Sequence, residues 1–234
     1  MFHVKHSGDQ NGAPSPHGST LAGIKEVFRA VGLALSDLQA EQFRVYRHEL
    51  LRWNRKVNLI SRKDEARIVE RHFVESAALS KLPVFEGGVS VLDIGTGAGF
   101  PGLPLKIVRR DIEILLLDSK RMKSLFLKAL TAKLKLDRVR VLYERAEKAA
   151  TATEYKEKFD VVVCRAIAEL ADVYSMAAPF LKKHGSLVAI KGSRLTAELA
   201  RFQSAHSAPT EIYELSELSS ITSLIPRVVI LGRS

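Results

Sequence analysis

The most regular feature of this chain is an alternation of apolar runs and helix-like segments that begins near residue 89. Short apolar runs bounded by turn residues are typical of buried strands, and apolar positions recurring every three or four residues indicate amphipathic helices. The apolar runs predict strands at 89–94, 112–118, 138–143, 159–164, 185–190, 211–215 and 227–232. The recurring positions predict helices at 101–109, 119–135, 169–181 and 194–205, with a short connection or helix after the third strand.

Alternating strands and helices are typical of a doubly wound parallel α/β sheet. The last two strands are separated only by the polar segment 216–225, so we expect them to pair antiparallel at the sheet edge. The pattern therefore predicts a Rossmann-like α/β domain at 84–234, with a seven-stranded sheet whose last strand is reversed.

The segment 21–83, which precedes the sheet, has a helical pattern. Ser36 followed by Gln39 matches a capping box at a helix start. One apolar face of this helix is predicted from Leu38, Phe43, Tyr46, Leu50, Trp53 and Val57. A second helix is predicted from near Asp64 to Pro83. Arginine and lysine occupy much of the remaining surface, so the segment is predicted to form a basic helical cap.

Composition limits the class of protein. Residues 1–20 are rich in Gly, Ser, Pro and His without periodicity, which predicts a disordered tail. The 234 residues carry a formal net charge of +10, which favours a polyanionic partner such as nucleic acid. The single cysteine, Cys164, excludes an internal disulfide and a cysteine-rich zinc site. Because no secretory signal or long apolar run is present, we expect a cytoplasmic protein without a membrane partner. No metal site is expected either.

The segment 91–102, VLDIGTGAGFPG, carries the strongest chemical signal. An apolar strand containing Asp93 stops at a turn with four glycines within eight residues. Glycine permits positive φ angles and close approach of a ligand, and Pro101 suits the first turn of the next helix. The segment therefore predicts a strand, loop and helix that hold a cofactor at the helix N-terminus.

Two cofactor classes are compatible with this loop. The run GAGFPG matches the dinucleotide fingerprint G-x-G-x-x-G, with Asp118 near the distance expected for a ribose contact. Asp93, two residues before Gly95, instead suits S-adenosylmethionine, because it would hold the turn or reach the methionine end through water and would repel a pyrophosphate. The reversed last strand is also typical of S-adenosylmethionine-dependent methyltransferases. A methyltransferase is therefore favoured, with a nicotinamide (NAD)-dependent oxidoreductase as the alternative.

Candidate site residues follow the strands, because ligands of open α/β sheets bind beyond the carboxyl ends of the strands. Asp118 is expected to accept the ribose hydroxyls or to cap the next helix. Ala146 and Glu147 follow the third strand, where the adenine ring would lie. Arg165 follows the fourth strand and suits a substrate phosphate or the carboxylate of the methyl donor. Cys164 is expected to be a buried strand residue.

The sequence lacks the motifs for two kinds of methyl acceptor, exocyclic amines and pyrimidine carbons. No [D/N]-P-P-[Y/F/W] motif for an exocyclic amine follows the fourth strand, and a second cysteine for carbon methylation is missing. The N7 atom of guanine already carries a lone pair, so positioning suffices without a general base. The basic charge favours RNA, whose single-stranded loops expose their bases.

Several motifs form a pattern that resembles one family. They are Trp53–Ser61, His72 with Glu75-Ser76, Asp93–Leu105, Ser119–Arg121, Arg145–Glu147, Cys164–Ala166 and Lys191-Gly192. Over about residues 35–205 they are similar to the ribosomal small-subunit methyltransferase G (RsmG) family, formerly called glucose-inhibited division protein B. The resemblance implies methylation of N7 of one guanine in bacterial 16S rRNA, with S-adenosyl-L-methionine as donor.

The resemblance also implies site residues. It places cofactor binding at Gly95, Gly97, Phe100, Asp118, Ser119, Lys120, Ala146, Glu147 and Arg165. Arg165 is the candidate for positioning the reactants, and His72 is interpreted as structural or RNA-positioning, since N7 needs no base. Two departures are Glu75, where the family usually has Asp, and the C-terminal IPRVV, which lacks an expected Arg-His-Leu pattern and leaves the register of the last strand open.

The sequence thus predicts a monomeric methyltransferase that acts on 16S rRNA or on a small-subunit assembly intermediate. The alternatives are an NAD-dependent oxidoreductase and a non-catalytic rRNA-binding assembly protein.

Overall fold

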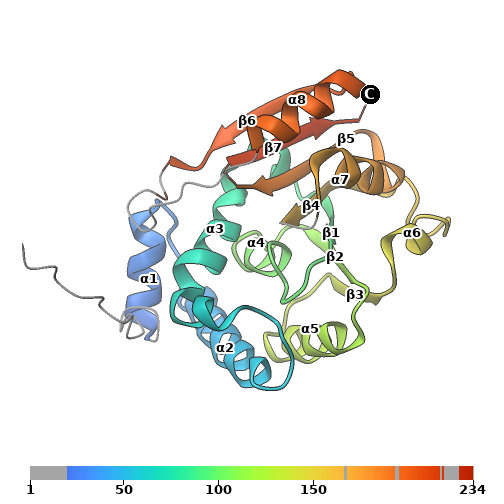
Figure 1. The fold of residues 1–234 in the computed structure, drawn as a ribbon. Coiled ribbons are helices and arrows are strands. Elements are labelled where there is room, and N and C mark those ends of the chain that lie inside the picture. The colour runs from blue at the N-terminus through green and yellow to red at the C-terminus, as the bar shows by residue number, and fades with distance from the viewer. Residues whose placement is uncertain (1–19, 166–167, 193–194, 217, 219–226, 234) are drawn as a thin grey trace, which may run out of the picture.

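A seven-stranded sheet lies at the centre of the computed structural model of the chain (Figure 1). The structure describes residues 20–165, 168–192, 195–216, 218 and 227–233. The predicted tail up to residue 19, Ala166, and Ile225-Pro226 therefore lie outside the described residues. Across the sheet the strands are β3 (Val139–Tyr143), β2 (Glu113–Asp118), β1 (Ser90–Ile94), β4 (Phe159–Arg165), β5 (Leu181–Lys191), β7 (Arg227–Gly232) and β6 (Thr210–Glu214).

The strand directions confirm the predicted topology. The neighbours from β3 to β5 are parallel, whereas β7 is antiparallel to both β5 and β6. Ile230 shows the register of the reversed strand, since it lies opposite Val188 of β5 and Glu211 of β6. The carboxyl ends of β1, β2, β3 and β4 consequently meet at one edge of the sheet.

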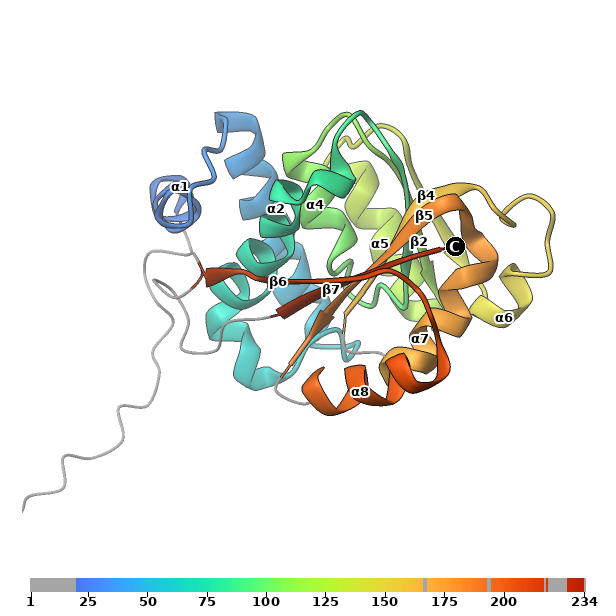
Figure 2. The ribbon, with the colours of Figure 1, turned by 90° about the horizontal axis from the view of Figure 1, so that it is seen from above.

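Helices cover both faces of the sheet (Figure 2). One face carries α4 (Gly102–Val108) and α5 (Arg121–Lys133), and the other carries α6 (Ala146–Ala149), α7 (Leu170–Ala177) and α8 (Leu195–Ala205). Because side chains alternate along a strand, Val91 enters the first core and Leu92 the second. Strands buried on both faces explain the continuous apolar runs in the sequence.

The N-terminal helices α1 (Leu21–Ala30) and α2 (Asp37–Asn54) pack on the α4 and α5 side. The predicted capping box is confirmed, since the Gln39 N–H donates to Ser36 Oγ (3.2 Å) and the Ser36 N–H donates to Gln39 Oε1 (2.9 Å). The prediction for Leu38 is wrong, because its side chain is 51% exposed. At 3.6 residues per turn, Leu38 lies about 140° around the helix from the buried Phe43.

The predicted second helix is not one continuous α-helix. It is a run of short turns, namely η2 (Arg62–Arg67), η3 (Val69–Val74), α3 (Glu75–Ala77), η4 (Ala78–Lys81) and η5 (Pro83–Phe85). The π-helical turn η3 buries three consecutive residues, His72, Phe73 and Val74. Successive α-helical residues point about 100° apart, so three in a row cannot share one buried face. The segment is instead enclosed by neighbouring helices on several sides.

The predicted helix 169–181 is too long. α7 ends at Ala177, and a short 3-10 turn, Ala178–Phe180, leads into β5 at Leu181. Pro179 in this turn has no N–H to donate, which favours the end of the α-helix. β5 is therefore 11 residues long and extends beyond the predicted strand at its N-terminal end.

Candidate cofactor pocket and arginine cluster

The glycine loop after β1 has the backbone conformation that its sequence predicts. Gly95, Gly97 and Gly99 have φ angles of +67°, +61° and +101°. A Cβ atom on Gly99 would lie 2.5 Å from Tyr46 Oη, and one on Gly102 would lie 2.6 Å from Asp93 Oδ2. The loop therefore requires glycine for its dihedral angles and, at the last two positions, for close packing.

The carboxylate of Asp93 supports this loop through two hydrogen bonds. Its Oδ2 accepts a hydrogen bond from the Thr96 hydroxyl (2.7 Å) and another from the Gly102 N–H (2.8 Å). The side chain is fully buried, and burial raises the pKa of the carboxyl to about 7. Of the two roles considered for Asp93, the structure shows the support of the turn.

Asp118 ends β2 and joins the glycine loop to α5. Its Oδ2 accepts from the Gly97 N–H (2.9 Å), and its Oδ1 accepts from the Lys120 N–H (2.7 Å). The N-cap position of α5 is Lys120, so Asp118 is not the helix cap that was considered as an alternative. Each carboxylate oxygen retains acceptor capacity, because an ionised carboxylate accepts at about four sites.

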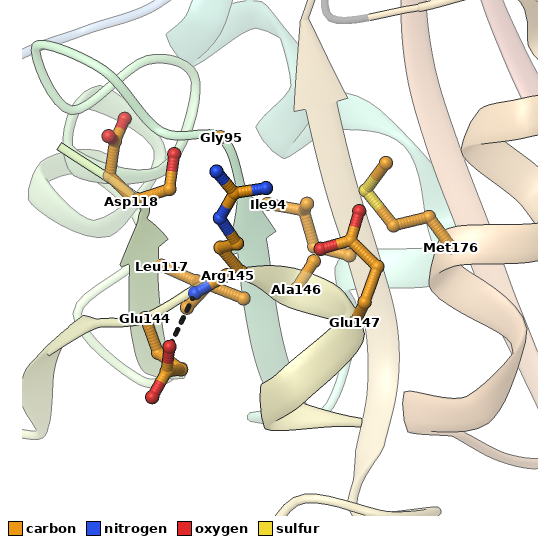
Figure 3. A pocket seen from close by; sticks show the side chains of 10 residues that line it. Ile94, Gly95, Leu117, Asp118, Glu144, Arg145, Ala146, Glu147 and Met176 are labelled. Carbon is orange, nitrogen blue, oxygen red and sulfur yellow. Dashed lines mark hydrogen bonds between the residues drawn. The ribbon is translucent and has the colours of Figure 1, made fainter. Parts of the chain in front are cut away.

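A pocket of about 260 Å³ opens beside Asp118 at the carboxyl ends of β1, β2 and β3 (Figure 3). It is lined by Ile94, Gly95, Leu117, Asp118, Ser119, Glu144, Arg145, Ala146, Glu147 and Met176. Five predicted residues line it, namely Gly95, Asp118, Ser119, Ala146 and Glu147. The structure does not place Gly97, Phe100, Lys120 and Arg165 in its lining.

The sequence-based assignment missed the other five lining residues, namely Ile94, Leu117, Glu144, Arg145 and Met176. The guanidinium of Arg145 points into the pocket toward Gly95, and Met176 of α7 closes the opposite side (Figure 3). Arg145 directly precedes the Ala146-Glu147 motif, so its position was a usable signal. Met176 comes from a helix distant in sequence, and no local pattern marks it.

Arg165 lies instead in a second, largely buried group at the end of β4. Its Nη2 is 2.7 Å from His72 Nδ1, and its Nη1 is 3.2 Å from Glu75 Oε2. The guanidinium carbon lies 5.0 Å from the centre of the Phe100 ring, which also stacks on His72 at 4.9 Å. We call these four residues, Arg165, His72, Glu75 and Phe100, the arginine cluster. It joins the N-terminal segment to the glycine loop.

The electrostatics of the arginine cluster fix the protonation of His72. Arg165 only donates, so His72 Nδ1 accepts and the ring is neutral. Burial, followed by the charge of Arg165, lowers the pKa of His72 to about 3. Burial also raises the pKa of Glu75 despite the nearby guanidinium. These contacts fit the structural interpretation of His72.

Cys164, the residue before Arg165, is buried in the sheet as predicted. Burial raises the pKa of its thiol to about 12. A thiol in that state is a poor nucleophile, because the thiolate is the reactive form.

Comparison with known proteins places the chain in a family. A sequence model of the family described as rRNA small subunit methyltransferase G matches residues 39–220. The chain belongs to this family. The ribosomal RNA small subunit methyltransferase G of Roseiflexus sp. (strain RS-1) is 43% identical over 177 residues, covering 76% of this chain and 75% of the relative. The same-named protein of Clostridium perfringens (strain 13) is 36% identical over 176 residues, covering 75% and 74%.

Solved structures show the same fold. A predicted O-methyltransferase from Agrobacterium tumefaciens has a TM-score of 0.52 at 18% identity, covering 68% of this chain and 81% of its own. A precorrin-6y C5,15-methyltransferase from Geobacter metallireducens has a TM-score of 0.51 at 15% identity, covering 69% and 87%. The predicted resemblance to the RsmG family and the predicted fold class are thereby confirmed.

Proposed function

We propose that this RsmG-family protein transfers a methyl group from S-adenosyl-L-methionine to N7 of guanine 527 in 16S rRNA. Family membership favours a methyltransferase over the NAD-dependent oxidoreductase. The observation that carries the proposal is the pocket beside Asp118, formed where β1, β2 and β3 end. The glycine loop and Asp118 form one hydrogen-bonded unit at its rim.

The residues of the pocket fit an adenosine-containing methyl donor. Asp118 presents a carboxylate with free acceptor capacity, which suits a pair of ribose hydroxyls. Ile94, Leu117 and Met176 supply apolar surface on which a purine ring can pack. We assign cofactor binding to Gly95, Gly97, Phe100, Asp118, Ser119, Lys120, Ala146, Glu147 and Arg165. Bound S-adenosyl-L-methionine supplies an electrophilic methyl group on a sulfonium.

The proposed acceptor, N7 of guanine, carries a lone pair and needs no deprotonation. Its lining includes neither histidine nor cysteine, and its ionisable side chains are Asp118, Glu144, Arg145 and Glu147. Elsewhere in the described chain, His72 is held as an acceptor by Arg165, and the Cys164 thiol is buried. Orientation of the base against the methyl group is then the main contribution of the protein.

The charge of the chain suits an RNA substrate. The formal net charge is +10, and phosphate contacts by Lys and Arg supply much of nucleic-acid affinity. None of the helices in the described parts of the chain combines the length and the apolar composition of a membrane span. We propose a monomer that acts in the cytoplasm on 16S rRNA or a small-subunit assembly intermediate, with residues 21–83 as the cap of a catalytic domain at 84–234.

Two measurements test this proposal. Isothermal titration should show binding of S-adenosylhomocysteine and none of NADH; binding of NADH alone would restore the oxidoreductase. Methylated positions should then be mapped on rRNA from cells with and without the gene. Loss of one N7-methylguanine is expected without it. Cofactor binding with no change in rRNA methylation would favour the non-catalytic assembly protein.

A further inference from the structure

One face of α2 is a row of basic side chains that the cofactor pocket does not use. A shallow groove of about 420 Å³ is lined by Arg44, Arg47, His48, Leu51, Arg52 and Arg55. These positions follow the spacing of three and four residues that places side chains on one helix face. At 1.5 Å per residue the row is about 16 Å long, enough to follow several successive phosphates of a nucleic acid. We call it the α2 stripe.

The charges of the α2 stripe are only partly neutralised. Arg44 pairs with Glu41 (2.6 Å) and Arg52 with Glu49 (2.6 Å). The buried Glu49 also pairs with Lys133 of α5. Within the described part of the chain, Arg47 and Arg55 have no acidic partner at salt-bridge distance. These two guanidinium groups are therefore free to bind an external anion.

The α2 stripe runs toward the edge of the sheet that holds the pocket. Along α2, Gln42 donates to the carbonyl of Leu134 (2.9 Å), and Trp53 packs on Phe126 at 5.7 Å. α2 and α5 are therefore antiparallel neighbours (Figure 1). α5 begins beside Asp118, and the Tyr46 hydroxyl of α2 donates to the carbonyl of Ala98 (2.5 Å), so α2 lies directly against the glycine loop. Lys123, at the start of α5, lies 3.8 Å from the position of a Cβ on Gly97 and extends the positive charge to the loop.

From this arrangement we propose that the α2 stripe binds the phosphate backbone of the rRNA substrate and guides the target strand toward the pocket. The proposal rests on the proposed function, because it names the surface that holds that substrate. Arginine suits the role, since its planar guanidinium matches phosphate geometry. Contacts to phosphates position a nucleic acid without reading its sequence, so selection of the target base belongs to other residues.

The test compares two pairs of charge-neutralising substitutions. R47Q/R55Q removes both unpaired arginines of the stripe, and K156Q/K183Q removes two exposed lysines near the amino ends of β4 and β5, at the opposite sheet edge. The measurements are the affinity for transcribed, unmethylated 16S rRNA at several salt concentrations, the KM and kcat of methyl transfer, and the affinity for S-adenosylhomocysteine. Thermal unfolding verifies that each variant is folded.

R47Q/R55Q should weaken rRNA binding and raise the KM for rRNA at least tenfold, with kcat and S-adenosylhomocysteine affinity unchanged. The slope of log affinity against log salt should become shallower by about 1.5, since each phosphate contact contributes roughly 0.7 to 0.9. R47K/R55K keeps the charge and should retain most of the binding, and K156Q/K183Q should match the wild type.

Equal rRNA affinity and salt slope in the two glutamine pairs would overturn the α2 stripe as an RNA surface. Unchanged binding of free rRNA with lost methylation of small-subunit particles would also overturn it and indicate a ribosomal protein as the partner. If the wild-type protein binds rRNA but methylates no guanine, the proposed function fails, while the binding comparison still tests the stripe.

Discussion

Asp118 and Arg165 end two strands of the same sheet, yet they are held in different ways. Asp118, the last residue of β2, is fixed by the backbone N–H groups of Lys120 and of Gly97 in the neighbouring loop after β1, and it borders an open pocket. Arg165, after β4, is fixed by side chains of the N-terminal segment, which lie about 90 residues earlier in the chain. The first arrangement is local and the second depends on how two distant segments pack.

The difference has consequences for substitution. A change at Asp118 should affect the ligand more than the fold, since its carboxylate borders the pocket and bonds to backbone N–H groups of loops. A change in the arginine cluster should affect the fold and the site together, because its members are largely buried and Arg165 bonds to both His72 and Glu75. Measuring stability and cofactor binding on the same variants separates the two regions.

R165A should have the largest effect. Removal of the guanidinium leaves the largely buried Glu75 without its hydrogen-bonded cation and His72 Nδ1 without its donor. Breaking a buried pair in this way costs several kcal/mol, so the free energy of unfolding should fall by about 3 kcal/mol, and methyl transfer should be lost. Urea unfolding measures the first effect. In the double variant E75A/R165A the loss should be smaller than the sum of the single losses. If R165A had the same free energy of unfolding as the wild type, the contacts of Arg165 in the cluster would not stabilise the fold.

G99A and G97A compare a tightly packed position of the glycine loop with an open one. A Cβ on Gly99 would lie 2.5 Å from Tyr46 Oη and 2.7 Å from Leu103 Cδ1, so G99A should lose about 2 to 3 kcal/mol of stability through overpacking and positive-φ strain. A Cβ on Gly97 meets nothing closer than 3.8 Å, so G97A should lose only about 1 kcal/mol through its φ of +61°. Thermal unfolding compares them, and equal losses would contradict the assignment of Gly99 to the packed side.

The local parts of this molecule could be predicted from its sequence. The strand ends at Asp118 and Arg165 were recognisable because apolar runs stop at turns. The glycine loop was recognisable because close packing and positive φ angles require glycine. Pocket residues next to those strand ends, such as Ala146 and Glu147, followed from topology.

The non-local parts could not be predicted. The contacts of His72 with Arg165 arise from tertiary packing across 93 residues, and no short pattern records them. The same enclosure converts the expected helix 64–83 into a series of short turns, which a period of 3.6 cannot describe. Met176 reaches the pocket from α7, which packs on the face of the sheet opposite α4 and α5. The exposure of Leu38 shows that an apolar residue near a helix start does not by itself define the buried face.

D118N should affect the ligand more than the fold. The amide keeps the shape of the side chain but loses the charge that suits ribose hydroxyls, so S-adenosylhomocysteine affinity should fall by about 1 to 2 kcal/mol, close to tenfold. Only one amide atom is an oxygen, so the N–H of Gly97 or of Lys120 loses its acceptor, and the free energy of unfolding should also fall, by about 1 kcal/mol. Isothermal titration and urea unfolding on the same protein give both values. S119A, a change at an exposed lining residue, is the control and should have a smaller effect on affinity. Unchanged affinity in D118N would remove Asp118 from the cofactor site.

H72N should produce the smallest effect, and one that depends on pH. The pKa of His72 is lowered to about 3 by burial and by Arg165, so the unfolded chain binds a proton below about pH 6.5 that the folded chain does not. The stability contributed by neutral His72 is therefore complete above pH 6.5 and is lost progressively as the pH falls toward 3. Relative to H72N, the wild type should lose about 1 kcal/mol between pH 6.5 and pH 5.5.

The difference between the two proteins isolates His72 from other groups whose pKa is raised by burial, such as Asp93 and Glu75, because both are present in each protein. Burial raises the pKa of Asp93 to about 7, so Asp93 contributes in the opposite sense: its stabilisation is complete below about pH 4 and is lost as the pH rises through 7. Asp93 is present in both proteins and cancels in their difference, whereas Arg165 keeps an acceptor from the Asn amide in H72N. Parallel stability curves for the two proteins between pH 5.5 and 7.5 would mean that His72 gains its proton as readily when folded as when unfolded. The arginine cluster would then be open to solvent, and the contrast with the pocket at Asp118 would disappear.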